Sequence, residues 1–158
     1  MLIGPLPPAQ FDAAIQLWHD AGLTRPWNDP YQDLRRAIVD PASNVLAGIE
    51  AETLLATAMV GHDGHRGWVY HLAVNPNVRG RGHGRAMMQA CEAWLVERGA
   101  PKLNVMVRDD NATARGFYTS LGYQLSDVVV LSRPLQDPAA SRRASESLRL
   151  APGSAARH

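Results

Sequence analysis

The spacing of apolar residues predicts two helices in the first part of the chain. Apolar positions recur at helical intervals from Phe11 to Trp18, a pattern that ends at Gly22, and they recur again around Leu34. A short apolar segment precedes the first helix. Residues 23–30, between the two helices, are rich in proline, asparagine and aspartate, which are typical of turns.

Three strands are predicted next. Residues 45–49 and 53–60 form a hairpin around a polar turn at residues 50–52, and residues 68–74 are the most apolar stretch of the chain. A continuous apolar run, interrupted chiefly by His71, is typical of a strand buried at the centre of a sheet.

Helices and strands alternate through the rest of the chain. Apolar residues between 84 and 97 fall on one helical face, and residues 102–107 then form a strand. Asn111 caps a further helix that ends at Gly122, and residues 128–131 are the last predicted strand. This order predicts one α/β domain with a mixed sheet and no internal repeat.

The composition excludes several functional classes. The chain has 158 residues, of which 46% are hydrophobic and 20% charged, so it can build one hydrophobic core. Its 16 basic and 15 acidic residues leave a net charge of +1, which argues against a non-specific nucleic-acid binder. The lone cysteine, Cys91, cannot form an internal disulfide or a structural zinc site. Without a leader or an apolar run near 18 residues, we expect a cytoplasmic protein that uses neither membrane nor metal.

The C-terminal residues differ in composition from the rest. Residues 136–158 are rich in alanine, serine and arginine, and their four arginines against two acidic residues give +2. The first 135 residues therefore carry −1. Such a segment buries too little apolar surface to offset the entropy of ordering it. We therefore predict a folded domain over residues 1–135 and a flexible tail over residues 136–158.

The candidate chemistry is concentrated between the central strand and the helix after it. Glycines in this segment let backbone amides approach a ligand, and the start of a helix favours an anion. Arg79, Arg81 and Arg85 add positive charge, so the expected ligand carries phosphates. The dinucleotide motif fails because Arg85 stands where its last glycine belongs, and the chain has no Gly-Lys pair for a phosphate loop of the nucleotide-hydrolase type. A flexible Arg/Gly segment that contacts RNA is the alternative.

Two motifs resemble the GNAT N-acetyltransferases. The run Arg79-Gly80-Arg81-Gly82-His83-Gly84 fits their acetyl-CoA loop, Q/R-x-x-G-x-G/A, and Leu72 to Pro76 fits the L-A-V-x-P that precedes it. Asn111 to Tyr123 fits N-x-x-A-x-x-F-Y-x-x-x-G-Y. The resemblance covers about residues 1–135. The segments R-P-W-N-D-P and D-G-H-R-G are most similar to the small bacterial YpeA-like subgroup.

The resemblance implies a fold and a cofactor site. The fold is α/β (α+β), with a mixed, mostly antiparallel sheet of six to seven strands, about four helices and splayed central strands. Acetyl-CoA would be held by the backbone of the splayed strand, by the loop and by the asparagine of the second motif. These cofactor-binding residues are Leu72, Ala73, Val74, Arg79, Gly80, Arg81, Gly82, His83, Gly84, Arg85, Asn111 and Tyr118.

The implied reaction is transfer of an acetyl group from acetyl-CoA to a primary amine, by direct attack. Tyr118 matches the family tyrosine that protonates the leaving thiolate. Several relatives place a glutamate on the strand equivalent to residues 68–74, where this chain has none, so His71 is the candidate general base. A hydrogen-bonded histidine of the sheet is the alternative for His71. The acceptor is a small-molecule amine or a peptide amine.

Two segments are candidates for the acceptor wall. The first lies between the first two helices, where Trp27 either covers the core or stacks on substrate and Asp29 either binds a cation or caps a helix. The second is the loop before the central strand. The candidate acceptor residues are Trp27, Asn28, Asp29, Asp63, His65 and Arg66.

Other functions remain open at this level. The same fold can bind acetyl-CoA or CoA as a sensor without turnover, an alternative that the missing strand carboxylate keeps open. An RNA-binding adapter would use the Arg/Gly loop and the tail, and its binding would depend strongly on salt. A homodimer is also compatible with the resemblance, because many relatives pair through their last strands.

Overall fold

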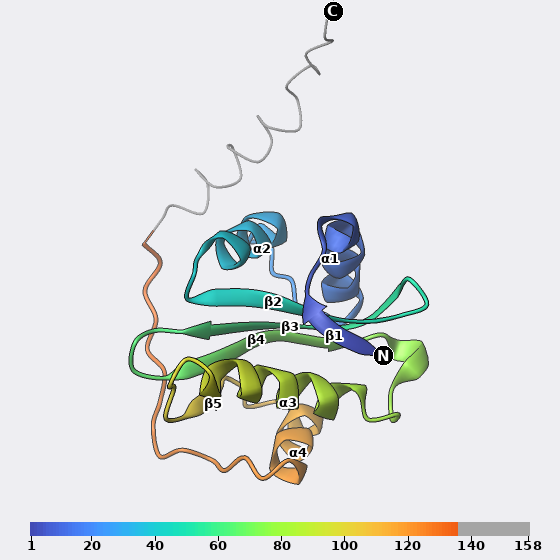
Figure 1. Ribbon diagram of the computed structural model, residues 1–158. Helices are drawn as coiled ribbons and strands as arrows, with labels where there is room; N and C mark the ends of the chain where they lie inside the picture. The colour runs from blue at the N-terminus through green and yellow to red at the C-terminus, as the bar shows by residue number, and fades with distance from the viewer. Residues whose placement is uncertain (136–158) are drawn as a thin grey trace, which may run out of the picture.

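The computed structural model describes residues 1–135, and the predicted tail, residues 136–158, lies outside the described residues. A central sheet has α1 and α2 on one face and α3 and α4 on the other (Figure 1). The helices and strands are β1 (Leu2–Pro5), α1 (Phe11–Asp20), α2 (Pro30–Val39), β2 (Ser43–Glu50), β3 (Thr53–His62), β4 (Gly67–Val74), α3 (His83–Val96), β5 (Leu103–Val105) and α4 (Ala112–Ser120). Short 3-10 turns precede α1 and follow β4.

The sheet is mixed and mostly antiparallel, as predicted. Its strand order is β1-β2-β3-β4-β5, and only the β4–β5 pair is parallel. Among residues 1–135 five strands form, fewer than the six to seven expected. None of the helices in that part of the chain is both long enough and apolar enough to cross a membrane.

The prediction of a last strand at residues 128–131 is wrong. These residues form no ladder, and Val129 and Leu131 are 86% and 91% exposed. β-branched residues favour a strand only where a pleated surface packs against neighbours. The segment finds neither a partner strand nor a covering helix, so its apolar composition alone does not make it a strand.

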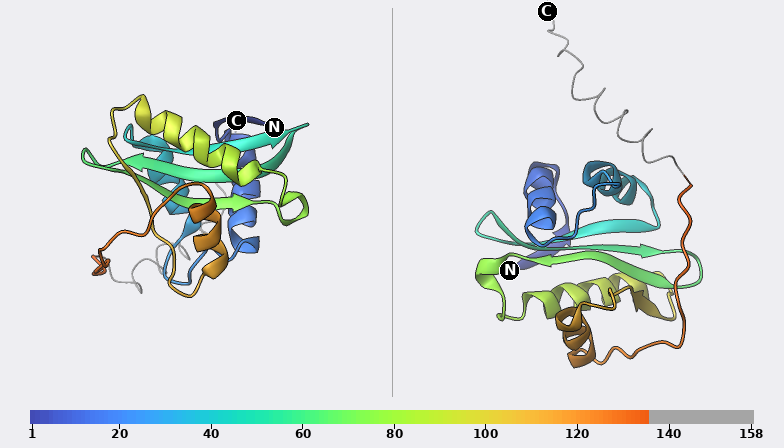
Figure 2. Two further views of the ribbon diagram at one scale, coloured as in Figure 1. Left: turned by 90° about the horizontal axis from the view of Figure 1, so that it is seen from below. Right: turned by 180° about the vertical axis from the view of Figure 1, so that it is seen from behind.

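Two hydrophobic clusters hold the helices on the sheet. On one face, the fully buried Trp18 of α1 and Leu34 of α2 pack against β2 and β3. On the other, Met87 and Cys91 of α3 pack against β3 and β4, as the predicted helical face requires. The two layers are seen from below and from behind in Figure 2. Hydrophobic packing thereby fixes helices to both faces of the sheet.

A bulge interrupts β4 in the middle of the sheet. Thr57 of β3 pairs with Ala73, but Met59 pairs with Tyr70, so two residues of β4 stand opposite the single residue between Thr57 and Met59. One of the two is His71, whose φ of +50° lies in the left-handed region that non-glycine residues rarely adopt.

The parallel pairing of β4 with β5 ends beside this bulge. The last pair is Val69 with Val105, so residues 70–74 of β4 have no partner on that side. The strands are therefore splayed, as expected. The strand predicted at residues 102–107 is correspondingly shorter. β5 has three residues, because it has no pairing partner beyond Val105.

Candidate active site

The glycine-rich loop forms a fixed turn at the start of α3. Gly80 and Gly82 have φ values of +78° and +83°, and Gly82 is the residue that caps the helix. A Cβ atom at either position would meet no atom within 4 Å. These two glycines are therefore required by backbone conformation, and the space in front of them is open to a ligand.

The last glycine of the motif has a different role. A Cβ atom on Gly84 would lie 3.2 Å from the ring of Phe117 and 3.7 Å from Val74. Gly84 thus lets α4 and β4 approach the first turn of α3. In this motif Gly80 and Gly82 are needed for backbone conformation, and Gly84 is needed for close packing.

Positive charge surrounds the start of α3. Arg79, Arg81 and Arg85 are exposed, and Arg79 donates a hydrogen bond of 3.4 Å to the Val74 carbonyl. Arg81 and Arg85 make no side-chain hydrogen bond or ion pair with any other residue in the range 1–135. Free guanidinium groups beside the N-terminus of a 14-residue helix form a fitting site for phosphate groups.

The second motif packs beside this loop. Asn111 caps α4 by accepting a hydrogen bond of 3.0 Å from the Ala114 amide, which leaves its side-chain nitrogen available. Tyr118 lies edge-on to Phe117 and Tyr123, with ring centroids 5.1 and 5.6 Å away. Burial raises the pKa of the Tyr118 phenol to about 12, with a smaller contribution from Cys91. The phenol therefore keeps its proton at neutral pH and can donate it.

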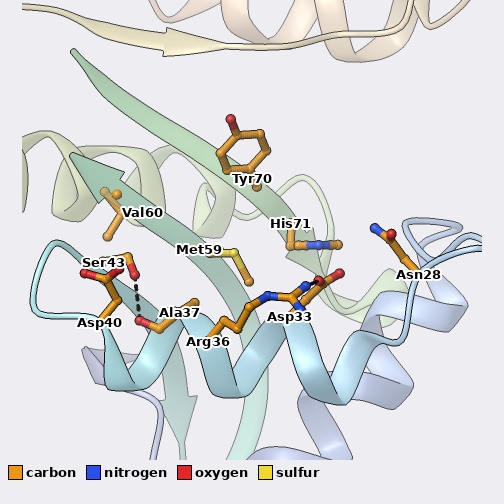
Figure 3. Close-up of a pocket in the computed structure, with 11 residues that line it drawn as sticks. Asn28, Asp33, Arg36, Ala37, Asp40, Ser43, Met59, Val60, Tyr70 and His71 are labelled. Atoms are coloured by element: carbon orange, nitrogen blue, oxygen red, sulfur yellow. Dashed lines mark hydrogen bonds and ion pairs between the residues drawn. The ribbon is translucent and has the colours of Figure 1, made fainter. Parts of the chain in front are cut away.

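An open pocket of about 380 Å³ lies on the other face of the sheet. Figure 3 shows it between α2 and the strands β3 and β4, with Tyr70 and His71 on the strand side and Asp33 and Arg36 on the helix side. Its volume is in the range of small-molecule sites. Arg36 pairs with Asp33, and the other lining residues are Asn28, Ala37, Asp40, Ser43, Met59, Val60 and Gly61.

The bulge explains why neighbouring residues share this pocket. In a regular strand, side chains alternate between faces, so Tyr70 and His71 would point in opposite directions. Here both line the pocket, whereas Val69 and Leu72, three positions apart, both pack on the α3 side. The extra residue of the bulge thus turns His71 towards α2.

His71 is suited to accept a proton. Its imidazole stacks on Trp18, with centroids 4.3 Å apart and planes at 16°. Burial lowers the pKa of His71 below its ordinary value of 6.5, and the nearby Asp33 opposes part of this effect. The imidazole is therefore neutral at pH 7, which is the form that a general base requires.

The residues between α1 and α2 have different surroundings. Asn28 lines the pocket, and Trp27 is 59% exposed. Asp29 caps α2 by accepting hydrogen bonds from the amides of Tyr31 and Gln32, so the capping interpretation of Asp29 has direct support.

The loop before β4 does not line the pocket. The Asp63 carboxylate accepts hydrogen bonds from the amides of His65 and Arg66 and from the Trp68 indole. These donors lower the pKa of Asp63 to about 2. Asp63, His65 and Arg66 build the turn that connects β3 and β4. An acceptor role for these residues stays a prediction.

Sequence reasoning missed the helical wall of the pocket. Asp33 and Arg36 lie three positions apart on α2, where the sequence pattern indicates a helix but no site. Tyr70 shares the pocket with His71 only because of the bulge, since regular alternation would put the two side chains on opposite faces. The buried Cys91 belongs to the core, as expected, and burial raises its pKa to about 12. Within residues 1–135 no group of three or more His, Cys, Asp or Glu side chains could hold a metal ion.

Comparison with known proteins agrees with these features. A family model described as the acetyltransferase (GNAT) family matches residues 12–123. The chain is 42% identical over 126 residues to a protein from Yersinia pestis named acetyltransferase, and the alignment covers 79% of this chain and 89% of the relative. The chain belongs to the GNAT acetyltransferase family. It is an acyltransferase, and its place in the YpeA-like subgroup stays a prediction.

Solved GNAT structures share the fold at low sequence identity. An aminoglycoside 6'-N-acetyltransferase from Acinetobacter haemolyticus superposes with a TM-score of 0.72 at 17% identity, covering 87% of this chain and all of that one. A predicted acetyltransferase from Clostridium acetobutylicum, solved with acetyl-CoA, has a TM-score of 0.69 at 14% identity, covering 84% of this chain and 95% of that one. At these identities the likeness shows the fold.

The two conformational glycines lead to a binding prediction. Gly82→Val places a β-branched residue at a φ of +83°, which strains the turn and moves the loop amides. We expect acetyl-CoA affinity, measured by calorimetry, to fall at least about tenfold. Gly99→Val is the matched control, because Gly99 has a φ of +72° and an equally open Cβ position at the other end of α3. Equal affinity in both variants would contradict the placement of the phosphates at this loop.

Proposed function

We propose that this GNAT enzyme transfers the acetyl group of acetyl-CoA to a primary amine, by direct attack of the amine in a ternary complex. One observation carries the proposal: consecutive residues of β4 serve two sites. Tyr70 and His71 line the pocket, and the residues that follow at once, Leu72–Val74, continue the part of β4 that has no partner on β5. An amine in the pocket and a thioester on the splayed strand would meet at this point.

On the cofactor side, each element supplies one kind of contact. The unpaired backbone of Leu72, Ala73 and Val74 would hydrogen-bond the amides of the pantetheine arm. The loop from Arg79 to Arg85 would hold the pyrophosphate with its amides and guanidinium groups. The side-chain nitrogen of Asn111 would contact the cofactor arm.

On the acceptor side, charge favours an amine. Asp33 and Asp40 contribute two carboxylates to the pocket against the single guanidinium of Arg36. Such a wall attracts a protonated amine, and Asn28 also lines it. The exposed Trp27 next to Asn28 would extend the acceptor site towards solvent. The pocket is open, so it suits either a small molecule or a peptide amine as acceptor.

The chemical step forms one bond and breaks another. An amine that enters in its protonated form first loses one proton to solvent. The neutral nitrogen then attacks the thioester carbon, the C–N bond forms and the C–S bond breaks. His71 takes the proton that the nitrogen must lose, and Tyr118 gives its proton to the departing thiolate. A backbone N–H on the unpaired part of β4 would stabilise the negative charge that develops on the carbonyl oxygen.

Three further expectations belong to this proposal. We assign the activity to residues 1–135 and the enzyme to the cytoplasm. We also infer self-association through residues 125–131, because this segment exposes apolar side chains including Val128 and Leu131.

The direct test of the function measures thiol release with the wild-type chain. We expect calorimetry to detect acetyl-CoA binding, and a panel of amines (a polyamine, an aminoglycoside, an amino-acid amide and a tripeptide) to include at least one that releases CoA. Tight acetyl-CoA binding without turnover on any amine would favour a sensor. Salt-dependent RNA binding without CoA affinity would favour the adapter.

Tyr118→Phe tests the proton donor. Removing the hydroxyl should lower kcat by about 10²-fold or more, because the thiolate then leaves without general-acid help, while acetyl-CoA affinity stays close to that of the wild type. Tyr123→Phe is the matched control, because its hydroxyl donates a 2.7 Å hydrogen bond to Glu92 and has no role in the proposed step. A Tyr118→Phe rate equal to that of wild type would remove Tyr118 from the mechanism.

The pH dependence of the rate tests His71. Because burial lowers the pKa of His71, its base form should be lost only below the ordinary value of 6.5. We expect kcat/KM of the wild type to fall as the pH drops below this value. We expect this acidic limb of the pH profile to be absent in His71→Gln. The charged groups that line the pocket around it are Asp33, Arg36 and Asp40 of α2. An unchanged limb in His71→Gln would assign the titration to another group.

A further inference from the structure

The position of His71 depends on a hydrogen-bonded chain that crosses from α1 to β4. The indole Nε1 of Trp18 donates to the hydroxyl Oγ1 of Thr57 at 2.9 Å. The same hydroxyl donates to the backbone carbonyl of His71 at 3.4 Å. Thr57 is the only fully buried polar or charged residue among residues 1–135.

The hydrogen bond between Thr57 and His71 lies at the bulge of β4 and not elsewhere in the core. Thr57 is the last residue of β3 in register with β4 before the irregularity, paired with Ala73. Its hydroxyl reaches back to His71, the bulge residue with positive φ. The polar chain therefore ends on the backbone of one of the two bulge residues of β4.

The side chain of His71 is held by the same partner. The Trp18 ring stacks on the imidazole while its N–H bonds Thr57, so one fully buried residue contacts both the side chain and, through Thr57, the backbone of the bulge. Two independent contacts thus fix the same conformation.

From this geometry we propose that Trp18 and Thr57 are positioning residues for acetyl transfer, holding the β4 bulge and with it both the His71 side chain and the unpaired strand Leu72–Val74. The inference rests on the proposed function. If the bulge relaxed to a regular strand, alternation would turn His71 away from α2, and the strand after it would shift by one register position.

The experiment separates the hydroxyl from the shape of Thr57. Thr57→Val keeps the branched side chain and removes the hydroxyl, whereas Thr57→Ser keeps the hydroxyl. We expect kcat for the amine found in the panel to fall about 10- to 100-fold in Thr57→Val, with acetyl-CoA affinity changed by less than about threefold, and to recover in Thr57→Ser.

A spectroscopic measurement needs no acceptor. The carbonyl ¹³C resonance of [1-¹³C]acetyl-CoA should shift on binding to the wild type, as the backbone of β4 polarises the carbonyl. We expect most of this shift to be lost in Thr57→Val and retained in Thr57→Ser. Trp18→Phe, which keeps a stacked ring and removes the donor, should give a smaller loss than Thr57→Val.

Val45→Ala controls for lost stability. Val45 is fully buried on β2, does not itself line the pocket and takes no part in the hydrogen-bonded chain from Trp18 to His71, so its truncation should lower the melting temperature and leave the carbonyl shift unchanged. A wild-type kcat and a wild-type carbonyl shift in folded Thr57→Val would overturn the positioning role. Losses in Val45→Ala equal to those in Thr57→Val would also overturn it.

If Thr57→Val does not fold, Trp18→Phe provides the same test. Failure of the proposed function is distinct, since the wild type itself would then release no thiol.

Discussion

The mismatch between β3 and β4 at His71 is the constraint on which the candidate site depends. Two residues of β4 stand opposite one residue of β3, so the regular alternation of faces is broken in the middle of the sheet. One consequence is a pocket lined by two consecutive side chains. Pairing with β5 also ends beside the bulge, at Val69, which leaves the following backbone free. The candidate acceptor pocket and the candidate cofactor strand therefore meet at a single irregularity.

The two faces of the sheet supply complementary groups to this point. The face covered by α1 and α2 offers a neutral imidazole among carboxylates, and the face covered by α3 and α4 offers a phenol that burial keeps protonated. A base and an acid on opposite sides of one strand suit a reaction in which a proton leaves one reactant and another reaches the leaving group. The buried Thr57 hydroxyl beside the bulge has two hydrogen-bond partners, the Trp18 indole and the His71 carbonyl.

Much of the fold was predictable because it follows from local periodicity. The apolar faces of α1 and α3, the hairpin of β2 and β3 and the central strand all appear where the pattern indicates. The fixed turn before α3 was predictable for a related reason, since Gly80 and Gly82 adopt backbone conformations that other residues disfavour. The strand at residues 128–131 was not, because strand formation needs a partner that composition does not report.

The sequence by itself determined the order of elements as far as α4 and the glycine-rich turn before α3, because these follow from residue type and spacing along the chain. The candidate acid Tyr118 came from the resemblance of its motif to the GNAT family. Tertiary structure decided which side chains meet. Asp33 and Arg36 join Tyr70 and His71 only because α2 packs over β3 and β4, and His71 faces them only because the bulge reverses its side. A bulge is a relation between two strands held by a third element, here Trp18 of α1, so no local pattern in the sequence encodes it.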